Sequence, residues 1–161
     1  MRVGDFMTSP AVFCRPEANL AAVAALMWDK DCGALPVVSE DGKVTGMITD
    51  RDICVALGTR NKRASEVTVR DVIYGQTRTC RPDDEIQAAL KTMCEGRIRR
   101  LPVVNGAGAL EGILCLDDLV LRARHCDGAR RPGVSYEDVV NTSRAICRRH
   151  AQPKNLLALA A

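Results

Sequence analysis

Histidine and aromatic side chains are scarce in this sequence, and their scarcity argues against two classes of function. The only histidines, His125 and His150, are isolated, and no Ser-His-Asp or Cys-His-Asp grouping accompanies them. We therefore expect no enzymatic activity. The chain holds one Trp, two Tyr and two Phe, and its first 120 residues carry no strongly basic stripe. This composition weighs against nucleic-acid binding.

Long apolar runs are also missing. No uninterrupted apolar stretch approaches the roughly 20 residues that a membrane span needs. Residues 1–5, MRVGD, do not resemble the start of a secretory signal. Hydrophobic residues make up 47% of the chain and charged residues 27%, as in ordinary globular proteins. We expect a soluble, cytoplasmic protein with no membrane partner.

Cysteine is abundant, but its spacing indicates neither a metal site nor a disulfide framework. No C-x-x-C pair occurs, and no histidine accompanies the cysteines in a ligand pattern. We expect most of the thiols to be buried, acting as small hydrophobic groups in a reducing compartment. A redox role stays open, because reactivity depends on exposure and thiolate character. The eight residues are Cys14, Cys32, Cys54, Cys80, Cys94, Cys115, Cys126 and Cys147.

An internal repeat is the strongest feature of the sequence. At an offset of 66 residues the chain matches itself without a gap over about 50 residues. Identical residues return in one register: Cys14-Arg15-Pro16 as Cys80-Arg81-Pro82, Met27 as Met93, Leu35-Pro36-Val37-Val38 as Leu101-Pro102-Val103-Val104, Gly46 as Gly112, and Asp52 as Asp118. We therefore expect two copies of one unit, residues 1–60 and 67–126.

Each copy predicts the element order β-α-β-β-α, which is an α+β fold. An extended segment (11–14 and 77–80) precedes a helix, two strands follow (35–38 with 44–48, and 101–104 with 110–114), and final helices begin near Asp50 and Leu116. Strands this few and short are not stable alone. We expect the copies to pack face to face as a pseudo-twofold pair, with one shared core and paired clefts.

The start of the last helix in the first copy admits two interpretations. Thr49 suits a helix N-cap, and the acids that follow suit the helix dipole. The same groups could bind a nucleotide: free amides and the Thr49 hydroxyl for phosphate, Arg51 for phosphate oxygens, and Asp52 for sugar hydroxyls.

A second candidate region precedes the second Leu-Pro-Val-Val strand. Residues 97–100 read Arg-Ile-Arg-Arg, whereas the first copy has Asp-Cys-Gly-Ala at 31–34. Three arginines within four residues are not core residues. They form either a solvated basic edge or a phosphate clamp that includes Arg99 and Arg100.

These segments together resemble the CBS domain, the cystathionine β-synthase type repeat, in both copies over about residues 1–125. The resemblance rests on the Cys-Arg-Pro segment, the Leu-Pro-Val-Val strand and the Gly-x-x-Thr-x-x-Asp stretch, and the chain is similar to small bacterial proteins made of a CBS pair. It implies a regulatory module that binds AMP, ADP, ATP, NAD or S-adenosylmethionine between the repeats and requires no cofactor. It also implies a homodimer that acts on an unknown target protein.

The resemblance implies specific ligand-binding residues. The motif aspartates, Asp52 and Asp118, would hold ribose, and Thr49 would contact phosphate or ribose. The family's adenine contacts correspond to backbone near Ala34, Pro36 and Pro102 and to the first segment near Val12 and Arg78. Arg99 and Arg100 match arginines that contact phosphate in some members.

The second copy departs from the family pattern at one position. Cys115 stands where the family has Ser or Thr, and a thiol is a much poorer hydrogen-bond partner. We therefore expect two unequal sites. The same departure leaves an alternative open, in which the chain is a structural or protein-interaction module with a vestigial cleft.

The residues after the repeat predict one more helix. Residues 128–133 read as a linker, and 134–150 as an amphipathic helix capped at Ser135 with arginines in its last turns. From Leu121 onward the chain has eight Lys or Arg against three Asp or Glu, so the net charge of +3 belongs to this part. We expect the helix to pack on its own module or across a dimer; docking of a partner is the alternative.

Overall fold

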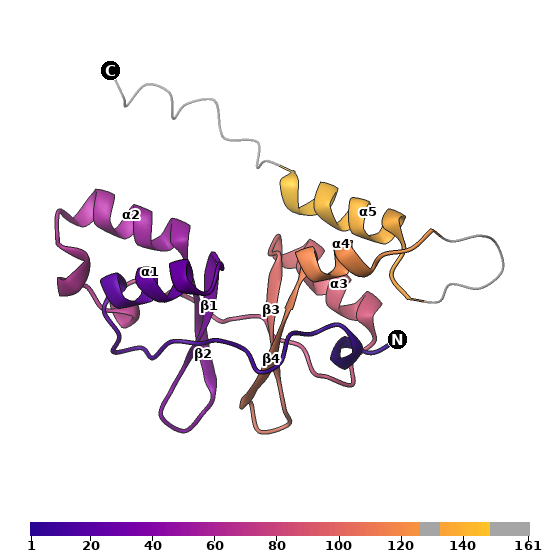
Figure 1. Ribbon diagram of the computed structural model, residues 1–161, viewed down its shortest axis with the longest axis horizontal. Helices are drawn as coiled ribbons and strands as arrows, with labels where there is room; N and C mark the ends of the chain where they lie inside the picture. The colour runs from indigo at the N-terminus through magenta and orange to yellow at the C-terminus, as the bar shows by residue number, and fades with distance from the viewer. Residues whose placement is uncertain (126–132, 149–161) are drawn as a thin grey trace, which may run out of the picture.

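The computed structural model describes residues 1–125 and 133–148 of the chain (Figure 1). Its α-helices and strands run in the order α1 (Leu20–Asp29), β1 (Ala34–Val38), β2 (Val44–Thr49), α2 (Asp50–Arg60), α3 (Ile86–Gly96), β3 (Arg100–Val104), β4 (Leu110–Cys115), α4 (Leu116–Arg122) and α5 (Tyr136–Cys147). Short 3₁₀ helices lie at Val3–Asp5, Ala64–Glu66 and Val69–Asp71. No helix in this part of the chain has both the length and the apolarity of a bilayer-spanning segment.

The two units have the same strand register, which confirms the repeat. In the first antiparallel hairpin Ala34 pairs with Thr49, and in the second Arg100 pairs with Cys115, 66 residues later. The register shift also falls at the equivalent place, between residues 37 and 38 and between 103 and 104. The predicted α+β fold is confirmed, with the four hairpin strands and both final helices where the sequence places them.

The expected first strand of each unit is reduced to one bridge. Cys14 forms a single parallel bridge to Val37, and Cys80 forms one to Val103. The Cys14 amide donates to the Pro36 carbonyl at 3.0 Å. Because the next residue but one is a proline, which has no N–H, this ladder does not continue along alternate residues. The units are therefore α-β-β-α with an extended segment laid against the hairpin.

Buried apolar residues form two clusters, so the prediction of one shared core is wrong. One cluster lies under α1 and α2, and the other lies under α3, α4 and α5. Each two-stranded sheet is covered by the helices of its own unit, and the hairpins stand side by side in the middle of the molecule (Figure 1). Backbone hydrogen bonds join the hairpin tips, from the Val44 amide to the Gly108 carbonyl at 3.1 Å and from Leu110 to Gly42 at 3.3 Å.

Each core is completed by the segment that opens the other copy in the sequence. Val3 and Phe6, at the start of the chain, are 0% and 3% exposed and lie in the second core. Val69 and Val72, which open the second copy, lie in the first core. The backbone contacts are equivalent, because Val3 donates to the Asp84 carbonyl and Val69 to the Ala18 carbonyl, both at 2.9 Å. Packing therefore crosses the division between 1–60 and 67–126.

Helix α5 packs on α3 and α4 of the second unit. This agrees with the expectation that the helix packs on its own module. It begins with a capping box in which the Asp138 carboxylate accepts from the Ser135 amide at 3.0 Å and from its hydroxyl at 2.8 Å. Val139 and Thr142, 7% and 3% exposed, face α3 and α4. The helix spans Tyr136–Cys147 within the predicted 134–150. Most of the predicted linker, and His150, lie outside the described residues.

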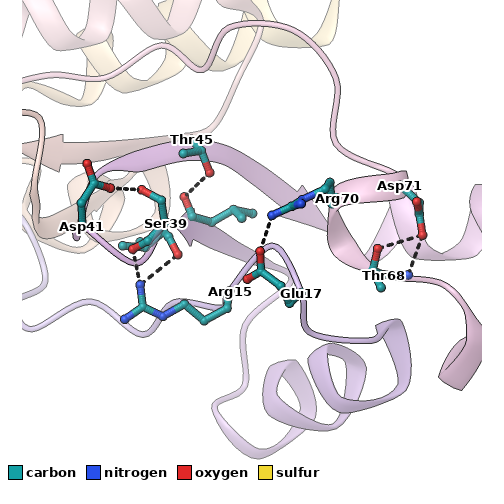
Figure 2. A network of polar contacts seen from close by, with 10 residues as sticks. Arg15, Glu17, Ser39, Asp41, Thr45, Thr68, Arg70 and Asp71 are labelled. Carbon is teal, nitrogen blue, oxygen red and sulfur yellow. Dashed lines mark hydrogen bonds and ion pairs between the residues drawn. The ribbon is translucent and has the colours of Figure 1, made fainter.

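The Arg15 side chain connects the first extended segment to the adjacent hairpin turn by hydrogen bonds (Figure 2). Its guanidinium donates to the carbonyls of Val38, at 3.1 Å, and of Ser39. The Ser39 hydroxyl in turn bonds the Asp41 carboxylate, which Lys43 approaches at 2.9 Å. These contacts hold the turn through which the hairpins meet.

Replacing Arg15 with alanine should lower the free energy of unfolding by about 1 kcal/mol, because two hydrogen bonds of an exposed side chain are lost. Urea unfolding monitored by circular dichroism measures this change. The matched control is Arg81→Ala in the second copy. The bonds recorded for Arg81 use its backbone: its amide donates to the Asp84 carboxylate at 2.7 Å, and its carbonyl accepts from the Asp84 amide at 3.1 Å. Both survive the substitution. Equal destabilisation by both variants would contradict this role for the Arg15 side chain.

Candidate functional site: a basic cleft between the repeats

A cleft of about 650 Å³ opens between the two units, within the size range of small-molecule sites. It is bounded by the start of α2, the end of α3, residues 74–78 near the start of the second copy, and the last turn of α5. Its lining residues are Gly33, Ala34, Met47, Thr49, Asp50, Arg51, Tyr74, Gln76, Thr77, Arg78, Gly96, Arg97, Ile98, Arg99, Arg100 and Ile146.

Half of the predicted ligand-binding residues meet in this cleft. The structure places six of them in its lining: Ala34, Thr49, Arg51, Arg78, Arg99 and Arg100. The other six lie outside it: Val12, Pro36, Asp52, Pro102, Cys115 and Asp118. The cleft therefore joins the phosphate-binding candidates of both copies, and it separates them from the two aspartates expected to hold ribose.

Positive charge dominates the cleft. Five arginines line it, and Asp50 is the one acid in its lining. Arg78 lies 3.7 Å from Glu95, and Arg100 lies 3.8 Å from Asp117, and both acids are more than half exposed. The structure records no ion pair for the other three arginines, at positions 51, 97 and 99, within residues 1–125 and 133–148. Guanidinium groups arranged in this way suit phosphate oxygens.

Thr49 and Asp52 form a capping box, so the N-cap interpretation of this stretch holds geometrically. The Asp52 carboxylate accepts from the Thr49 amide at 2.9 Å and from its hydroxyl at 2.7 Å, and the Asp52 amide donates to the same hydroxyl at 3.1 Å. Asp52 lines a smaller pocket of about 180 Å³, which shares Arg51 and Tyr74 with the cleft. A ligand in the cleft would meet Asp52 by reaching past these two side chains.

The corresponding helix start in the second copy is built differently. Cys115 is the N-cap of α4 and makes no side-chain capping bond. Burial raises the pKa of its thiol to about 11, and the nearby Asp118 carboxylate adds to the effect. Asp118 instead accepts a long hydrogen bond, 3.5 Å, from the Thr8 hydroxyl. The two helix starts therefore differ in their hydrogen bonding, and the inequality of the two ligand sites stays a prediction.

The remaining predicted positions are occupied by strand and loop contacts. Pro36 and Pro102 are buried in β1 and β3, where their carbonyls accept from the amides of Cys14 and Cys80 at 3.0 and 3.1 Å. Val12 is exposed on the first extended segment. Of the positions named for adenine, Ala34 and Arg78 line this cleft, and Val12, Pro36 and Pro102 do not.

Several lining residues were not predicted from the sequence. Tyr74, Gln76 and Thr77 lie near the start of the second copy, between the 3₁₀ helix Val69–Asp71 and Cys80, and Ile146 comes from α5, outside the repeat altogether. Arg97 ends α3 with a left-handed backbone, φ 51°. Its place within the Arg-Ile-Arg-Arg stretch was the available signal, whereas nothing in the repeat pattern points to Ile146.

The comparison with known proteins identifies the family. The CBS domain model matches residues 3–59 and 64–124, and the chain belongs to the CBS domain family. It is 31% identical to the CBS domain-containing protein YhcV of Bacillus subtilis over 139 residues, which cover 85% of this chain and 97% of YhcV. Among solved structures it is similar to CBSX2 of Arabidopsis thaliana in complex with AMP, at 27% identity and a TM-score of 0.66, over 75% of this chain and 94% of CBSX2.

Enzymes also contain this module as a minor part. The chain is 34% identical to inosine-5'-monophosphate dehydrogenase of Mycobacterium tuberculosis over 119 residues. The match covers 74% of this chain but 22% of that enzyme. The chain is also 30% identical to a Methanopyrus kandleri protein over 118 residues, which cover 73% of this chain and 60% of that protein. The similarity to these longer relatives therefore concerns the repeat pair.

The expectation that most cysteines are buried is wrong. Of the seven described thiols, Cys14 and Cys80 are buried, and the others are partly or fully exposed, Cys54 and Cys147 most of all. The buried pair sits at the single bridges of the two extended segments; Cys54, Cys94 and Cys147 lie on helices, Cys115 ends β4, and Cys32 lies in the loop between α1 and β1. Burial raises the pKa of the Cys14 thiol to about 11 and that of Cys80 to about 12.

Alkylation should therefore divide the thiols into two groups. At about pH 8 the thiols of Cys14, Cys80 and Cys115 remain protonated, because their pKa values are raised to about 11 or 12, and the thiolate is the nucleophile. Iodoacetamide followed by peptide mass spectrometry should modify Cys54 and Cys147 first. Early modification of Cys80 in the native protein would contradict this assignment.

Proposed function

We propose that this chain is a regulatory sensor that binds a phosphorylated adenosine nucleotide in the basic cleft between its repeats. The observation that carries the proposal is the presence of five arginines, one from the first copy and four from the second, in one cleft with a single acid. Family membership supports it, as does the similarity to CBSX2, whose structure contains AMP. The proposed role is non-enzymatic, and we place the sensor in the cytoplasm.

The charge of the cleft supports a ranking of ligands. Each added phosphate brings more negative charge to the arginines, so affinity should increase from AMP to ADP to ATP. NAD carries two phosphates, whereas S-adenosylmethionine carries none and bears a sulfonium cation. Phosphates would lie among Arg51, Arg97 and Arg99, with ribose directed toward Asp52 in the adjoining pocket. We propose the nucleotide as a regulatory ligand and not as a required cofactor.

The proposal extends to how the sensor transmits ligand occupancy. The cleft is lined by both units and by Ile146 of α5, so a bound ligand contacts three parts of the fold at once. A ligand that binds one arrangement of these parts more tightly shifts the population toward it. We propose that a target protein reads this shift, and that the sensor is a homodimer, the commonest symmetric assembly.

A structural module with a vestigial cleft is the second candidate. The Thr49–Asp52 capping box favours it, because Asp52 already accepts two hydrogen bonds from Thr49. Cys115 favours it too, since a weakly bonding thiol stands in place of a hydroxyl. In this case no nucleotide would bind, and the acids at the helix starts would serve stability alone.

Calorimetry on the full chain tests the first proposal. AMP, ADP, ATP, NAD and S-adenosylmethionine are titrated separately, and Arg99→Ala should weaken ATP binding by roughly tenfold, as expected for one charge-assisted hydrogen bond. Arg63→Ala, an exposed arginine outside the cleft lining, should leave affinity unchanged. Binding of none of the five ligands at millimolar concentration would leave the structural module as the function.

A second substitution separates ribose binding from helix capping. Asp52→Ala removes a capping box and the proposed sugar contact, and affinity for ATP should fall by about tenfold or more. Asp71→Ala removes the similar Thr68–Asp71 capping box (Figure 2), whose bonds are 2.8 and 3.0 Å. Asp71 is outside the cleft lining, and its carbonyl, which accepts from the lining residue Tyr74 at 3.3 Å, is kept in this variant. Both variants should lose stability by about 1 kcal/mol. Equal ATP affinity in both would contradict a ribose role for Asp52.

A further inference from the structure

The segments that open the two copies begin in the same way. Each starts with a short 3₁₀ helix, Val3–Asp5 in the first copy and Val69–Asp71 in the second. The amides of Met7 and Ile73 then donate to the first residue of their own 3₁₀ helix, at 2.9 and 3.1 Å. Any difference in the path of the chain beyond these two residues therefore has a local cause.

One residue later, the first segment pairs with β4, whereas the second does not pair with β2. The Thr8 amide donates to the Ile113 carbonyl at 2.8 Å, and the Ile113 amide donates to the Thr8 carbonyl at 3.0 Å. In the part of the chain that the structure describes, no backbone bond or bridge joins the equivalent residues, Tyr74 and Met47. We call residues 7–9 the strap, because they lie as an extra edge along the second hairpin only.

Gly112 allows the strap to lie this close to β4. A Cβ atom at Gly112 would lie 2.8 Å from the Thr8 carbonyl oxygen, which belongs to the backbone. At the equivalent Gly46, a Cβ atom would lie 2.9 Å from Cδ1 of Ile73, the end of a side chain that can rotate. The Ser9 hydroxyl adds a bond from the strap to a β4 carbonyl, at 2.8 Å. The close approach of backbone to backbone is therefore a property of the second hairpin.

A single glycine accounts for the different path of the second segment. Gly75, which follows Tyr74, has a φ of 74°, in the left-handed region that glycine adopts readily. Its counterpart in the first copy is Ser9, whose backbone is not left-handed. The turn at Gly75 directs the chain away from β2, so that Tyr74 and Met47 both line the open basic cleft.

The strap also carries a hydroxyl group to the carboxylate at the second helix start. The Thr8 hydroxyl donates to Asp118 of α4 at 3.5 Å. In the first copy, the Tyr74 hydroxyl is bonded to Arg60 at 2.7 Å, and Tyr74 lines both the basic cleft and the adjoining pocket of Asp52. Thr8 therefore meets Asp118 in the way that a sugar hydroxyl would meet Asp52.

Charge at the second helix start opposes phosphate binding as well. At the offset of 66 residues, Asp117 takes the place of Arg51, and Val12 takes the place of Arg78. Asp117 lies 3.8 Å from Arg100, so it also draws one guanidinium toward itself. A phosphate at this helix start would meet a carboxylate where the basic cleft presents an arginine, and like charges repel.

We propose that the strap is an autoinhibitory contact that closes the second helix start, with the Thr8 hydroxyl held on Asp118. The chain then binds one nucleotide, in the basic cleft, and none at Asp118 while the strap is in place. This stoichiometry rests on the proposed function, whereas the closure itself does not. Phe6, 3% exposed in the second core, anchors the chain just before the strap, so opening residues 7–9 leaves both cores packed.

Amide hydrogen exchange of the full chain without ligand, followed by nuclear magnetic resonance, tests the closure. The protection factor of the Ile113 amide, which is bonded to the strap, should exceed that of the equivalent Met47 amide at least about tenfold. Gly112→Ala should lower the Ile113 protection factor at least about tenfold, because the added methyl group displaces the Thr8 carbonyl. In the control, Gly46→Ala, the methyl group meets a rotatable side chain, and Ile113 protection should not change.

A milder pair of variants keeps the backbone bonds of the strap and changes its hydroxyl alone. Thr8→Ala removes the hydrogen bond to Asp118 and should lower the protection of the Ile113 amide by about threefold, as expected for one weak hydrogen bond. Thr8→Ser retains a hydroxyl and should protect Ile113 as the parent does. This pair tests the strap even where Gly112→Ala fails to fold.

Calorimetry measures what the strap excludes. The parent chain should bind one equivalent of ATP and, once saturated with ATP, no adenosine at millimolar concentration. Gly112→Ala saturated with ATP should bind one equivalent of adenosine, because the Asp118 carboxylate is then free to accept the ribose hydroxyls. Adenosine is the probe because it brings no phosphate toward Asp117.

Four results would overturn the proposal. They are equal protection of Ile113 and Met47 in the parent, unchanged Ile113 protection in both Gly112→Ala and Thr8→Ala, two equivalents of ATP bound by the parent, and equal adenosine binding by the parent and Gly112→Ala, including none by either. Failure of the parent to bind any ATP would contradict the proposed function, and the exchange measurements would still decide whether the strap closes the second helix start.

Discussion

The reciprocal burial of two short segments holds the molecule together. Val3 and Phe6 complete the second core, while Val69 and Val72 complete the first. Full burial of each such side chain contributes about 1.5–3 kcal/mol, so neither half has a finished core without a segment from beyond its own helices and hairpin. The hairpin tips, joined through Val44 and Gly108, fix the two halves beside each other, and the cleft forms along the boundary.

The charge and hydrogen-bonding groups of the cleft result from the sequence differences between the copies. The shared register places Ala34 opposite Thr49 and Arg100 opposite Cys115, so equivalent backbone carries different chemistry on the two sides. The first copy supplies a capped helix start, and the second supplies arginines at the end of α3. One symmetrical frame thereby produces one strongly basic surface. Among residues 1–125 and 133–148, helix α5 covers the second unit, and no equivalent helix covers the first.

Much of the fold could be predicted because it depends on local pattern. Proline and glycine positions, apolar spacing and the gapless offset determine the helices, the hairpins and their register. The sequence could not show whether the extended segments are strands or loops. The single bridge at Cys14 depends on which backbone groups of β1 are free to bond, and tertiary packing decides this. Arg99 and Arg100 were found because they belong to a cluster of arginines in the sequence, whereas Arg51 was named from the start of a helix and Arg78 from the family resemblance. Tyr74 and Ile146 were not, because tertiary packing alone brings a connecting segment and an added helix to the site.

The crossing of segments also records how such a chain could arise. Residues at the start of each copy complete the body of the other copy, with the same backbone bonds 66 residues apart. A single ancestral unit with this architecture would have paired as a two-chain assembly whose arms were exchanged. Duplication and fusion of such a unit would turn an association between molecules into one within a molecule. Joined copies need not be identical, and here equivalent helix starts carry Thr49 and Cys115.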